Sequence, residues 1–386
     1  MSVTKLPAAK KRPAGKKRRF HAVDASHSLN ERLRNLHERL LLKVPTVDRI
    51  ACALYDAGDD KLRTFINSTR SGSAITGYEF KLSKSRSLSG LAASGENRVI
   101  DYIPAVVPGD SAHSAWLLKQ GYCSSFTVPM YDNGMFSGVI FFNSMKIGAF
   151  TPRAQLDLGL FSNLINMTIS SELAAARAMS ASAHLAREFA NLRDFETGTH
   201  LERMARYARV IAKGVADAHG LSDEFVEHVH LFAPLHDIGK IGIPDSILLK
   251  PGPLDADERR LMETHVVKGT NMVSNMLVDF GLQHLPDAVL IRNIVASHHE
   301  FLDGSGYPNH LRGDKVPIEA RIIAVADIFD ALTSARPYKS AWPVERACDE
   351  LRGMVAKGKL DGDCVAAIER HAVELTEIGM RYRDAA

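Results

Sequence analysis

The chain has 386 residues, which is too long for one ordinary hydrophobic core, so two domains joined by a linker are expected. Its 45% hydrophobic and 24% charged residues are typical of a globular protein, and no apolar run approaches the roughly 20 residues that span a bilayer. No apolar segment follows the basic N-terminal residues, so no secretory signal is expected. Four cysteines without CxxC spacing indicate reduced thiols and a cytoplasmic protein.

The net charge of +3 is unevenly distributed along the chain. Residues 1–20 carry eight Lys or Arg and no acid, whereas the rest of the chain carries 40 basic and 45 acidic side chains. A tail such as KKRPAGKKRR cannot bury a core, so residues 1–26 are predicted to be disordered. The tail is either a solvated extension or a segment that binds weakly to anionic lipid or nucleic acid. It has no interleaved aromatic residues that would stack on nucleic-acid bases.

Residues 27–151 mix helical and strand patterns. Residues 27–43 place leucines at a helical spacing, and Pro45 ends that helix. Five strand-like runs follow, and the turn sequences Gly58-Asp59-Asp60 and Asp132-Asn133-Gly134 join four of them into hairpins. The predicted strands are 50–56, 62–67, 98–103, 123–131 and 136–142, with a short helix at 112–120. This order predicts an α+β domain around an antiparallel sheet.

The final hairpin reads TVPMYDNGMFSGVIFFNS, in which a strand with small residues enters an apolar one. Together with the element order, this hairpin resembles a GAF domain over about residues 30–172. The resemblance implies the fold and says nothing of a ligand, because no cysteine or histidine is placed for a bilin or a haem. Two interpretations stay open: a module for dimerisation or spacing, and a sensor of a small molecule.

A connecting helix is predicted over residues 152–190. It begins at Pro152, because proline is favoured at the start of a helix, and its alanine-rich second half contains no Gly or Pro. The narrow apolar stripe of this helix favours packing across a dimer axis, so a homodimer is predicted. The helix is either a signal path or a passive spacer. The residues of the stripe are Leu156, Leu160, Leu164, Met167, Ser171 and Ala174.

From residue 191 onward the sequence is mostly helical and supplies several side chains that can bind metal. Each histidine alone is more often structural, but eight such groups together, most of them in apolar segments, are hard to explain as core residues. Mixed imidazole and carboxylate ligation suits Fe, Mn or Zn better than Ca or Mg, and eight ligands suit two or three ions. The candidate ligands are Glu196, His200, His236, Asp237, His265, His298, His299 and Asp327.

Five motifs occur in order along residues 190–380 and resemble the HD-GYP family of metal-dependent phosphohydrolases. They read DFETGTH, LHDIGKIGIPD, HHEFLDGSGYP, LRGDKVPIEARIIAVADIFDALTS and RPYK. The resemblance implies an all-α domain over residues 191–386 that hydrolyses cyclic di-GMP to pGpG and often on to GMP. It implies a bi- or trinuclear centre of divalent Fe or Mn on the same eight ligands, with Glu196 distinguishing three metals from two.

Basic residues near these motifs are candidates for phosphate contact. Asp237 is predicted to be catalytic and to bridge the metals, and Lys240 to be catalytic by contacting a phosphate oxygen. Arg336 and Lys339 are predicted to hold the second phosphate of the substrate. Arg336 also fits a second interpretation, a cation that stabilises a helix C-terminus.

The DGSGYP loop is predicted to contact the nucleotide. Gly306 would allow the backbone to approach the substrate closely, and Tyr307 would offer a ring and a hydroxyl to a guanine or a ribose. The alternative for Tyr307 is packing against the core. Asp194 and Glu300 are predicted to orient metal ligands.

The sequence thus predicts a bacterial, cytoplasmic signalling enzyme in which a GAF-like domain at 27–151 regulates a cyclic di-GMP phosphodiesterase. Two alternatives stay open. One is a phosphohydrolase for another nucleotide, such as a cyclic GMP–AMP dinucleotide. The other is a catalytically idle receptor that holds the dinucleotide and recruits partners, and the intact ligand set with Lys240 argues against it.

Overall fold

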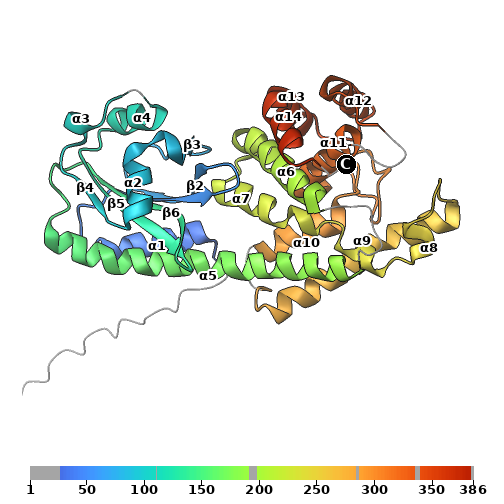
Figure 1. Ribbon diagram of the computed structural model, residues 1–386, viewed down its shortest axis with the longest axis horizontal. Coiled ribbons are helices and arrows are strands. Elements are labelled where there is room, and N and C mark those ends of the chain that lie inside the picture. The colour runs from blue at the N-terminus through green and yellow to red at the C-terminus, as the bar shows by residue number, and fades with distance from the viewer. Residues whose placement is uncertain (1–26, 110, 191–197, 284–286, 335–339, 384–386) are drawn as a thin grey trace, which may run out of the picture.

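The computed structural model of the chain describes residues 27–109, 111–190, 198–283, 287–334 and 340–383. An α+β domain and a helical domain lie side by side, and helix α5 (Pro152–Ala190) runs along both of them (Figure 1). This arrangement confirms the predicted fold classes and the long connecting helix. The basic tail, residues 1–26, lies outside the described residues. Within the described ranges, no helix combines the length and apolar character that crossing a bilayer requires.

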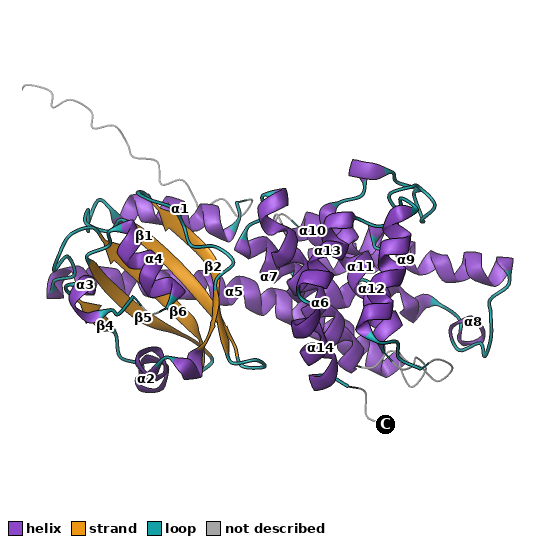
Figure 2. Ribbon diagram, turned by 90° about the horizontal axis from the view of Figure 1, so that it is seen from above, coloured by secondary structure: helices purple, strands orange, loops and turns teal. Residues whose placement is uncertain are grey.

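A six-stranded antiparallel sheet forms the centre of the α+β domain (Figure 2). The β5–β6 turn holds Asn133 and Gly134 at φ of 48° and 79°, a conformation that these two residue types adopt readily, as the turn sequence predicts. Both predicted hairpins are confirmed, whereas the edge strand β3 was not predicted. In the order β3-β2-β1-β6-β5-β4, the strands are Glu79–Lys81, Lys61–Thr69, Arg49–Asp56, Met135–Ser144, Ser124–Asp132 and Arg98–Ile100.

Helices cover both faces of this sheet. Helix α1 (Leu29–Leu40) and α5 pack on one face, where Leu33, Ile50, Phe142 and Ile165 belong to one buried core. Three short helices lie over the opposite face (Figure 1). The third of them has the predicted bounds, whereas the first two were not predicted. They are α2 (Arg86–Ser94), α3 (Ile103–Val106) and α4 (Ala112–Gln120).

Helix α5 turns different faces to the two domains and to solvent. Ile165 packs on the sheet, and farther along the helix Met179 joins the core of the helical domain. The predicted apolar stripe faces outward: the exposed fractions are 76% for Leu156, 71% for Leu160 and 69% for Met167. No described part of this chain covers the stripe, and the homodimer stays a prediction.

The C-terminal half is a helical domain whose core lies around α6 and α11. Apolar faces of its helices, including Ile211, Val229, Ile294 and Ile323, meet in one buried cluster. Two 3-10 helices, η2 (Ala233–Leu235) and η3 (Ile238–Gly242), follow α7. The α-helices are α6 (Gly198–His219), α7 (Asp223–Phe232), α8 (Asp245–Leu248), α9 (Ala256–Asp279), α10 (Asp287–Ser297), α11 (Ile318–Thr333), α12 (Val344–Ala356), α13 (Gly362–Arg370) and α14 (Ala372–Arg381).

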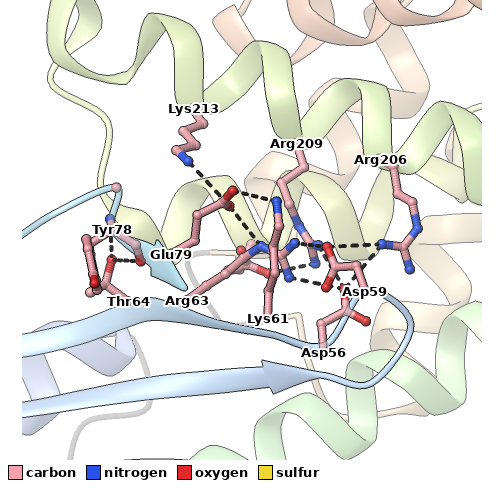
Figure 3. A network of polar contacts seen from close by, with 12 residues as sticks. Asp56, Asp59, Lys61, Arg63, Thr64, Tyr78, Glu79, Arg206, Arg209 and Lys213 are labelled. Atoms are coloured by element: carbon pink, nitrogen blue, oxygen red, sulfur yellow. Dashed lines mark hydrogen bonds and ion pairs between the residues drawn. The ribbon is translucent and has the colours of Figure 1, made fainter. Parts of the chain in front are cut away.

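Charged side chains join the two domains. Figure 3 shows arginines of α6 reaching the tip of the β1–β2 hairpin. Asp56 Oδ2 lies 3.0 Å from Arg209 Nη1 and 3.4 Å from Arg206 Nη1. Burial alone would raise the pKa of Asp56, yet Arg209, Arg206 and Arg63 hold this pKa well below its ordinary range. The hairpin is therefore held against the helix that begins two residues before His200.

Candidate metal centre

The adjacent His236 and Asp237 lie where a regular helix gives way to tighter turns. Helix α7 ends at Phe232, and the 3-10 helices η2 and η3 flank the pair on either side. Pro234 has no amide hydrogen to donate to the preceding turn, so the α-helical hydrogen-bond ladder cannot continue through it. The pair is thereby fixed at the end of an apolar helix, with His236 fully buried and Asp237 2% exposed.

Gly239 brings this segment against helix α9. A Cβ atom built on Gly239 would lie 1.9 Å from the carbonyl oxygen of His265 and 2.4 Å from the amide nitrogen of Gly269. Because real Cβ atoms do not approach backbone so closely, only glycine fits here. The close approach places Asp237 beside His265, whose Nε2 lies 3.1 Å from Asp237 Oδ1.

The predicted ligands gather in two adjacent clusters. In each cluster, one candidate ligand atom per residue lies within 4.8 Å of all the others. The clusters adjoin, because Asp237 of the first lies 3.0 Å from His236 Nε2 of the second. The first cluster contains Asp237, His265, His298 and His299, and the second contains His200, His236 and Asp327. Seven of the eight predicted ligands thus come together from α6, α9, α11 and the turns after α7 and α10.

Backbone hydrogen bonds fix the tautomers of three of these histidines. Nδ1 lies 2.9 Å from Ala233 O in His236, 2.8 Å from Met262 O in His265 and 3.1 Å from Val295 O in His298. A carbonyl oxygen only accepts, so each Nδ1 carries the proton and each Nε2 presents a lone pair. The three rings are therefore oriented as metal-binding imidazoles are.

The three Nε2 lone pairs converge on the carboxylate of Asp237. His236 Nε2 lies 3.0 Å from Oδ2, and His265 and His298 Nε2 lie 3.1 and 3.6 Å from Oδ1. Among the described residues, Asp237 Oδ1 and the Nε2 atoms of His265 and His298 are buried and have no hydrogen-bond partner. Lone pairs that face one another in a buried site repel, and a cation between them removes that repulsion. The donor set therefore fits metal ions.

The ionisation states of these groups agree with ligation. Burial would raise the pKa of Asp237, but the ammonium group of Lys240 holds this pKa well below its ordinary value. Burial lowers the pKa of His298, and burial followed by the neighbouring His298 lowers that of His299 well below its usual range. The carboxylate is therefore ionised and these imidazoles are neutral near pH 7, which are the forms that bind metal.

Lys240 lies against the cluster. Its Nζ is 2.8 Å from Asp237 Oδ2, and 20% of its side chain is exposed. From this position the ammonium group can reach both the carboxylate and a molecule that binds at the cluster from solvent. The expected phosphate contact of Lys240 stays a prediction.

A further carboxylate holds His200. Asp330 Oδ2 accepts a hydrogen bond from His200 Nδ1 at 2.6 Å and another from Arg203 Nη2 at 2.9 Å, and Arg203 also bonds Oδ1. Burial would raise the pKa of Asp330, but His200 and Arg203 lower it below the usual value. This carboxylate–imidazole pair leaves Nε2 of His200 to face the second cluster.

The sequence interpretation missed Asp330, although a signal was present. Asp330 follows Asp327 by three residues on the apolar helix α11, and Arg203 follows His200 by three residues on α6. Residues three apart share a helix face, so the two helices present a matched acid and base beside the ligands. An aspartate within an apolar helix needs a partner, and this rule applies to Asp330 as it does to Asp327.

Glu300 is bound to the DGSGYP loop. It is 2% exposed and accepts hydrogen bonds from the backbone amides of Asn309 at 2.6 Å and Leu311 at 2.9 Å. These contacts fasten the end of the DGSGYP loop. The prediction that Glu300 orients a metal ligand stays a prediction.

The DGSGYP loop packs on the histidine pair. The ring of Tyr307 stacks on that of His299, with centroids 4.7 Å apart and an interplanar angle of 30°, and burial raises the pKa of the Tyr307 hydroxyl. A Cβ atom on Gly306 would lie 2.4 Å from the backbone of both His299 and Phe301. The close approach that Gly306 permits is thus to the protein's own backbone, and its expected approach to substrate stays a prediction. Tyr307 combines core packing with a position beside a candidate ligand.

Four of the predicted residues lie outside the described ranges. Asp194 and Glu196 precede helix α6, and Arg336 and Lys339 follow α11. Their predicted roles as ligand, orienting group and phosphate contacts stay predictions.

A protein-family model described as an HD domain matches residues 164–364, slightly more than half of the chain. The chain belongs to the HD domain family. The matched range contains the seven described candidate ligands and begins within α5. Membership agrees with the all-α fold of this half and with the adjacent His236 and Asp237.

Curated relatives match the same half. The "Cyclic di-GMP phosphodiesterase response regulator RpfG" of Xanthomonas campestris pv. campestris is 44% identical over 190 residues, which cover 48% of this chain and 46% of that protein. The "Cyclic di-GMP phosphodiesterase" of Thermotoga maritima is 40% identical, with coverages of 50% and 49%. The "3'3'-cGAMP-specific phosphodiesterase 2" of Vibrio cholerae is 42% identical, with coverages of 43% and 30%. The chain thus spans about half the length of these relatives, or less.

The N-terminal half has structural neighbours of low similarity. The phycocyanobilin-bound GAF domain from a cyanobacterial phytochrome is 16% identical, covers 38% of this chain and 86% of that chain, and has a TM-score of 0.31. A score of this size carries no argument. The description of this half as an α+β domain rests on its sheet and the helices that cover it.

Proposed function

We propose that the chain is a metal-dependent phosphodiesterase that hydrolyses cyclic di-GMP to pGpG and then to GMP. The observation that carries this proposal is the convergence of three Nε2 lone pairs on the buried carboxylate of Asp237. Membership of the HD domain family and the activities named for the relatives support it.

In this proposal the two clusters hold two or three divalent ions, Fe or Mn, with Asp237 between them. Bound ions would supply a hydroxide nucleophile near neutral pH and would neutralise charge on the phosphodiester. The chain itself fixes the ligand set: backbone carbonyls orient His236, His265 and His298, and Asp330 orients His200. Glu196 is proposed as the eighth ligand.

Residues around the clusters would bind and orient the dinucleotide. The ammonium group of Lys240 contacts Asp237. We propose that it also contacts a phosphate oxygen when substrate binds. Tyr307 would place its ring edge beside a base while its face stays on His299. Arg336 and Lys339 are proposed to hold the second phosphate.

The α+β domain is proposed to regulate this activity within a homodimer. The solvent-facing stripe of Leu156, Leu160 and Met167 supports the dimer, because apolar residues at helical spacing seldom stay exposed without a partner. The four free cysteines support the proposed cytoplasmic location.

A second candidate substrate is a cyclic GMP–AMP dinucleotide. The relative from Vibrio cholerae that is 42% identical carries that specificity in its name. The third possibility, an idle receptor, would bind a dinucleotide without turnover, and the seven gathered ligands argue against it.

Turnover of three substrates by one preparation tests these alternatives. Protein purified without oxygen is supplied with Mn or Fe(II) and incubated with cyclic di-GMP, 3'3'-cGAMP or linear pGpG, and the products are separated. The proposal predicts pGpG and GMP from cyclic di-GMP, and no product from a His265→Ala variant. Faster hydrolysis of 3'3'-cGAMP would favour the second candidate, and binding without any product would overturn the proposed enzyme.

A further inference from the structure

Two arginines of α6 hold the same residue, Tyr382, which caps the C-terminus of helix α14. Arg203 Nη1 donates to the carbonyl oxygen of Tyr382 at 2.7 Å, and the guanidinium carbon of Arg206 lies 4.7 Å from the centre of the Tyr382 ring. The two arginines are three residues apart and therefore lie on one face of α6. Tyr382 is thus bound through its backbone by one arginine and through its ring by the other.

Arg203 connects Tyr382 to the candidate metal centre. Its other guanidinium nitrogens bind both carboxylate oxygens of Asp330, and Asp330 accepts the hydrogen bond from Nδ1 of His200. The guanidinium group is planar and has a fixed fork of donors, so its contact with Tyr382 also restricts how it can hold Asp330. The position of Tyr382 therefore bears on the orientation of His200.

Arg206 connects Tyr382 to the other domain. Its Nη1 lies 3.4 Å from Asp56 Oδ2 and 3.7 Å from Asp59 Oδ2, both in the β1–β2 hairpin (Figure 3). Gly58 lies so near that a Cβ atom built on it would be 2.7 Å from Arg206 Nη2 and 3.4 Å from the hydroxyl oxygen of Tyr382. The tip of the hairpin therefore meets both partners of this cation–ring contact directly.

Arg206 differs in this respect from two other cations that join α6 to the α+β domain. Arg209 Nη1 lies 3.0 Å from Asp56 Oδ2, and Lys213 Nζ lies 3.3 Å from Glu79 Oε2. Within the described ranges, Arg206 is the one of these three that lies over an aromatic ring. Arg209 and Lys213 fasten the domains together, whereas Arg206 in addition contacts the residue that Arg203 holds.

We propose that Arg206 and Tyr382 are positioning residues for the metal centre and that the β1–β2 hairpin acts on the centre through them. Arg206 holds the ring of Tyr382 and thereby keeps its carbonyl oxygen in place for Arg203. Arg203 in turn keeps Asp330 against His200. Displacement of the hairpin weakens the first contact and leaves His200 less firmly oriented, because each contact shares a residue with the next.

The inference rests on the proposed function of the two clusters as a metal site. It deepens the proposed regulation by naming the route from the α+β domain to one candidate ligand, His200. A contiguous set of contacts becomes a coupling route only when its members are shown to act together. The experiment therefore perturbs the route at both ends and compares the effects.

Metal retention in a chelator titration tests the role of the Tyr382 ring. Tyr382→Ala keeps the carbonyl oxygen that Arg203 binds and removes the ring that Arg206 holds. Tyr382→Ala and Arg206→Met should each weaken retention of one metal ion by between about twofold and thirtyfold, the range over which residues remote from a ligand change its binding. Tyr382→Phe keeps the ring and should retain metal as the parent does. A Tyr382→Phe variant as weak as Tyr382→Ala would overturn the role of the ring.

Arg209→Met and Lys213→Met are the matched controls. Each removes one cation between α6 and the α+β domain but leaves the Arg206–Tyr382 contact in place, so each should retain metal as the parent does. Circular dichroism and a thermal melt check folding. Arg206→Met should fold because Asp56 keeps Arg209, and Tyr382→Ala serves if it does not. Equal losses of metal in Arg206→Met and Arg209→Met would assign the effect to domain docking and refute the route through Tyr382.

A substitution in the hairpin tests whether the α+β domain reaches the centre this way. Gly58 is exposed, and Gly58→Val should displace the flexible end of Arg206 and weaken metal retention as Arg206→Met does. Ala57→Val, at the exposed neighbouring position, is the control and should have no effect. Combining Gly58→Val with Tyr382→Ala should cost no more than Tyr382→Ala alone, because both break the same contact. Additive losses would contradict a shared route.

Hydrogen exchange of the metal-free chain provides a readout that needs neither metal nor hydrolysis. After treatment with chelator, amides in the first turns of α6, around His200 and Arg203, should exchange faster in Gly58→Val and Tyr382→Ala than in the parent or in Arg209→Met. Unchanged exchange there in both variants would overturn the inference. A parent chain that binds no metal would contradict the proposed function alone, and the exchange rates would still decide whether the hairpin positions this end of α6.

Discussion

Replacing Asp330 with asparagine removes one charge from the metal-binding region and keeps the shape of the side chain. In the parent protein the carboxylate accepts hydrogen bonds from His200 Nδ1 and from two nitrogens of Arg203. An asparagine can accept through its oxygen, but its NH₂ group must then face a donor. Asp330→Asn therefore breaks at least one charge-assisted bond in a site that is 1% exposed.

The size of the effect follows from those contacts. Removing one partner of a buried ion pair costs about 3–5 kcal/mol of folding free energy, because the remaining charge is left uncompensated. Arg203 also donates to the carbonyl oxygen of Tyr382 at 2.7 Å, which favours the lower end of that range. Loss of a carboxylate that orients a ligating histidine weakens metal binding about 10–100-fold. We expect both effects in Asp330→Asn.

Urea unfolding measures the first effect, and metal retained during dialysis against graded chelator measures the second. Asp361→Asn is the matched control, since Asp361 is also a buried carboxylate with an arginine, 3.2 Å from Arg321 Nη1, but belongs to neither of the two clusters. The control should lose stability and keep its metal. If Asp330→Asn holds metal as tightly as the parent, Asp330 serves the fold alone and the account of His200 is wrong.

Three further changes test separate parts of the account. Lys240→Ala should retain metal and lose turnover, because its ammonium is proposed to contact phosphate; hydrolysis of cyclic di-GMP at the parent rate would exclude that role. Glu196→Ala should lower the metal content by about one ion per chain and reduce activity without abolishing it, since a two-metal core remains; an unchanged metal content in elemental analysis would make the centre dinuclear. Leu160→Glu should convert a dimer into a monomer in light scattering, because it places charge in the exposed stripe; a parent protein that is already monomeric at tens of micromolar would remove the basis for the dimer.

Much of the fold could be predicted because its signals are local. Asn133-Gly134 specifies a tight hairpin turn by backbone conformation alone, and Pro152 marks the start of α5. Helices α2 and α3 and strand β3 were not predicted, because their local signals are weak. They are short, and their sequences have too few apolar residues in register to show a period.

The candidate ligands could be predicted from residue type, but the residues that orient them depend on tertiary contacts. Asp237 and His265 are 28 positions apart and meet because Gly239 lets two backbones touch, a contact that no local pattern specifies. Glu300 follows the histidine pair, yet its carboxylate turns to the amides of the loop.

Metal content measured together with turnover tests the central claim most directly. Protein purified without oxygen should contain two or three Fe or Mn ions per chain, and its hydrolysis of cyclic di-GMP should stop with a chelator and return with added Mn or Fe(II). His265→Ala should lose metal and activity together, because its Nε2 is one of the three directed at Asp237. A reproducible metal content near zero, with no activity restored by either ion, would contradict the multinuclear centre.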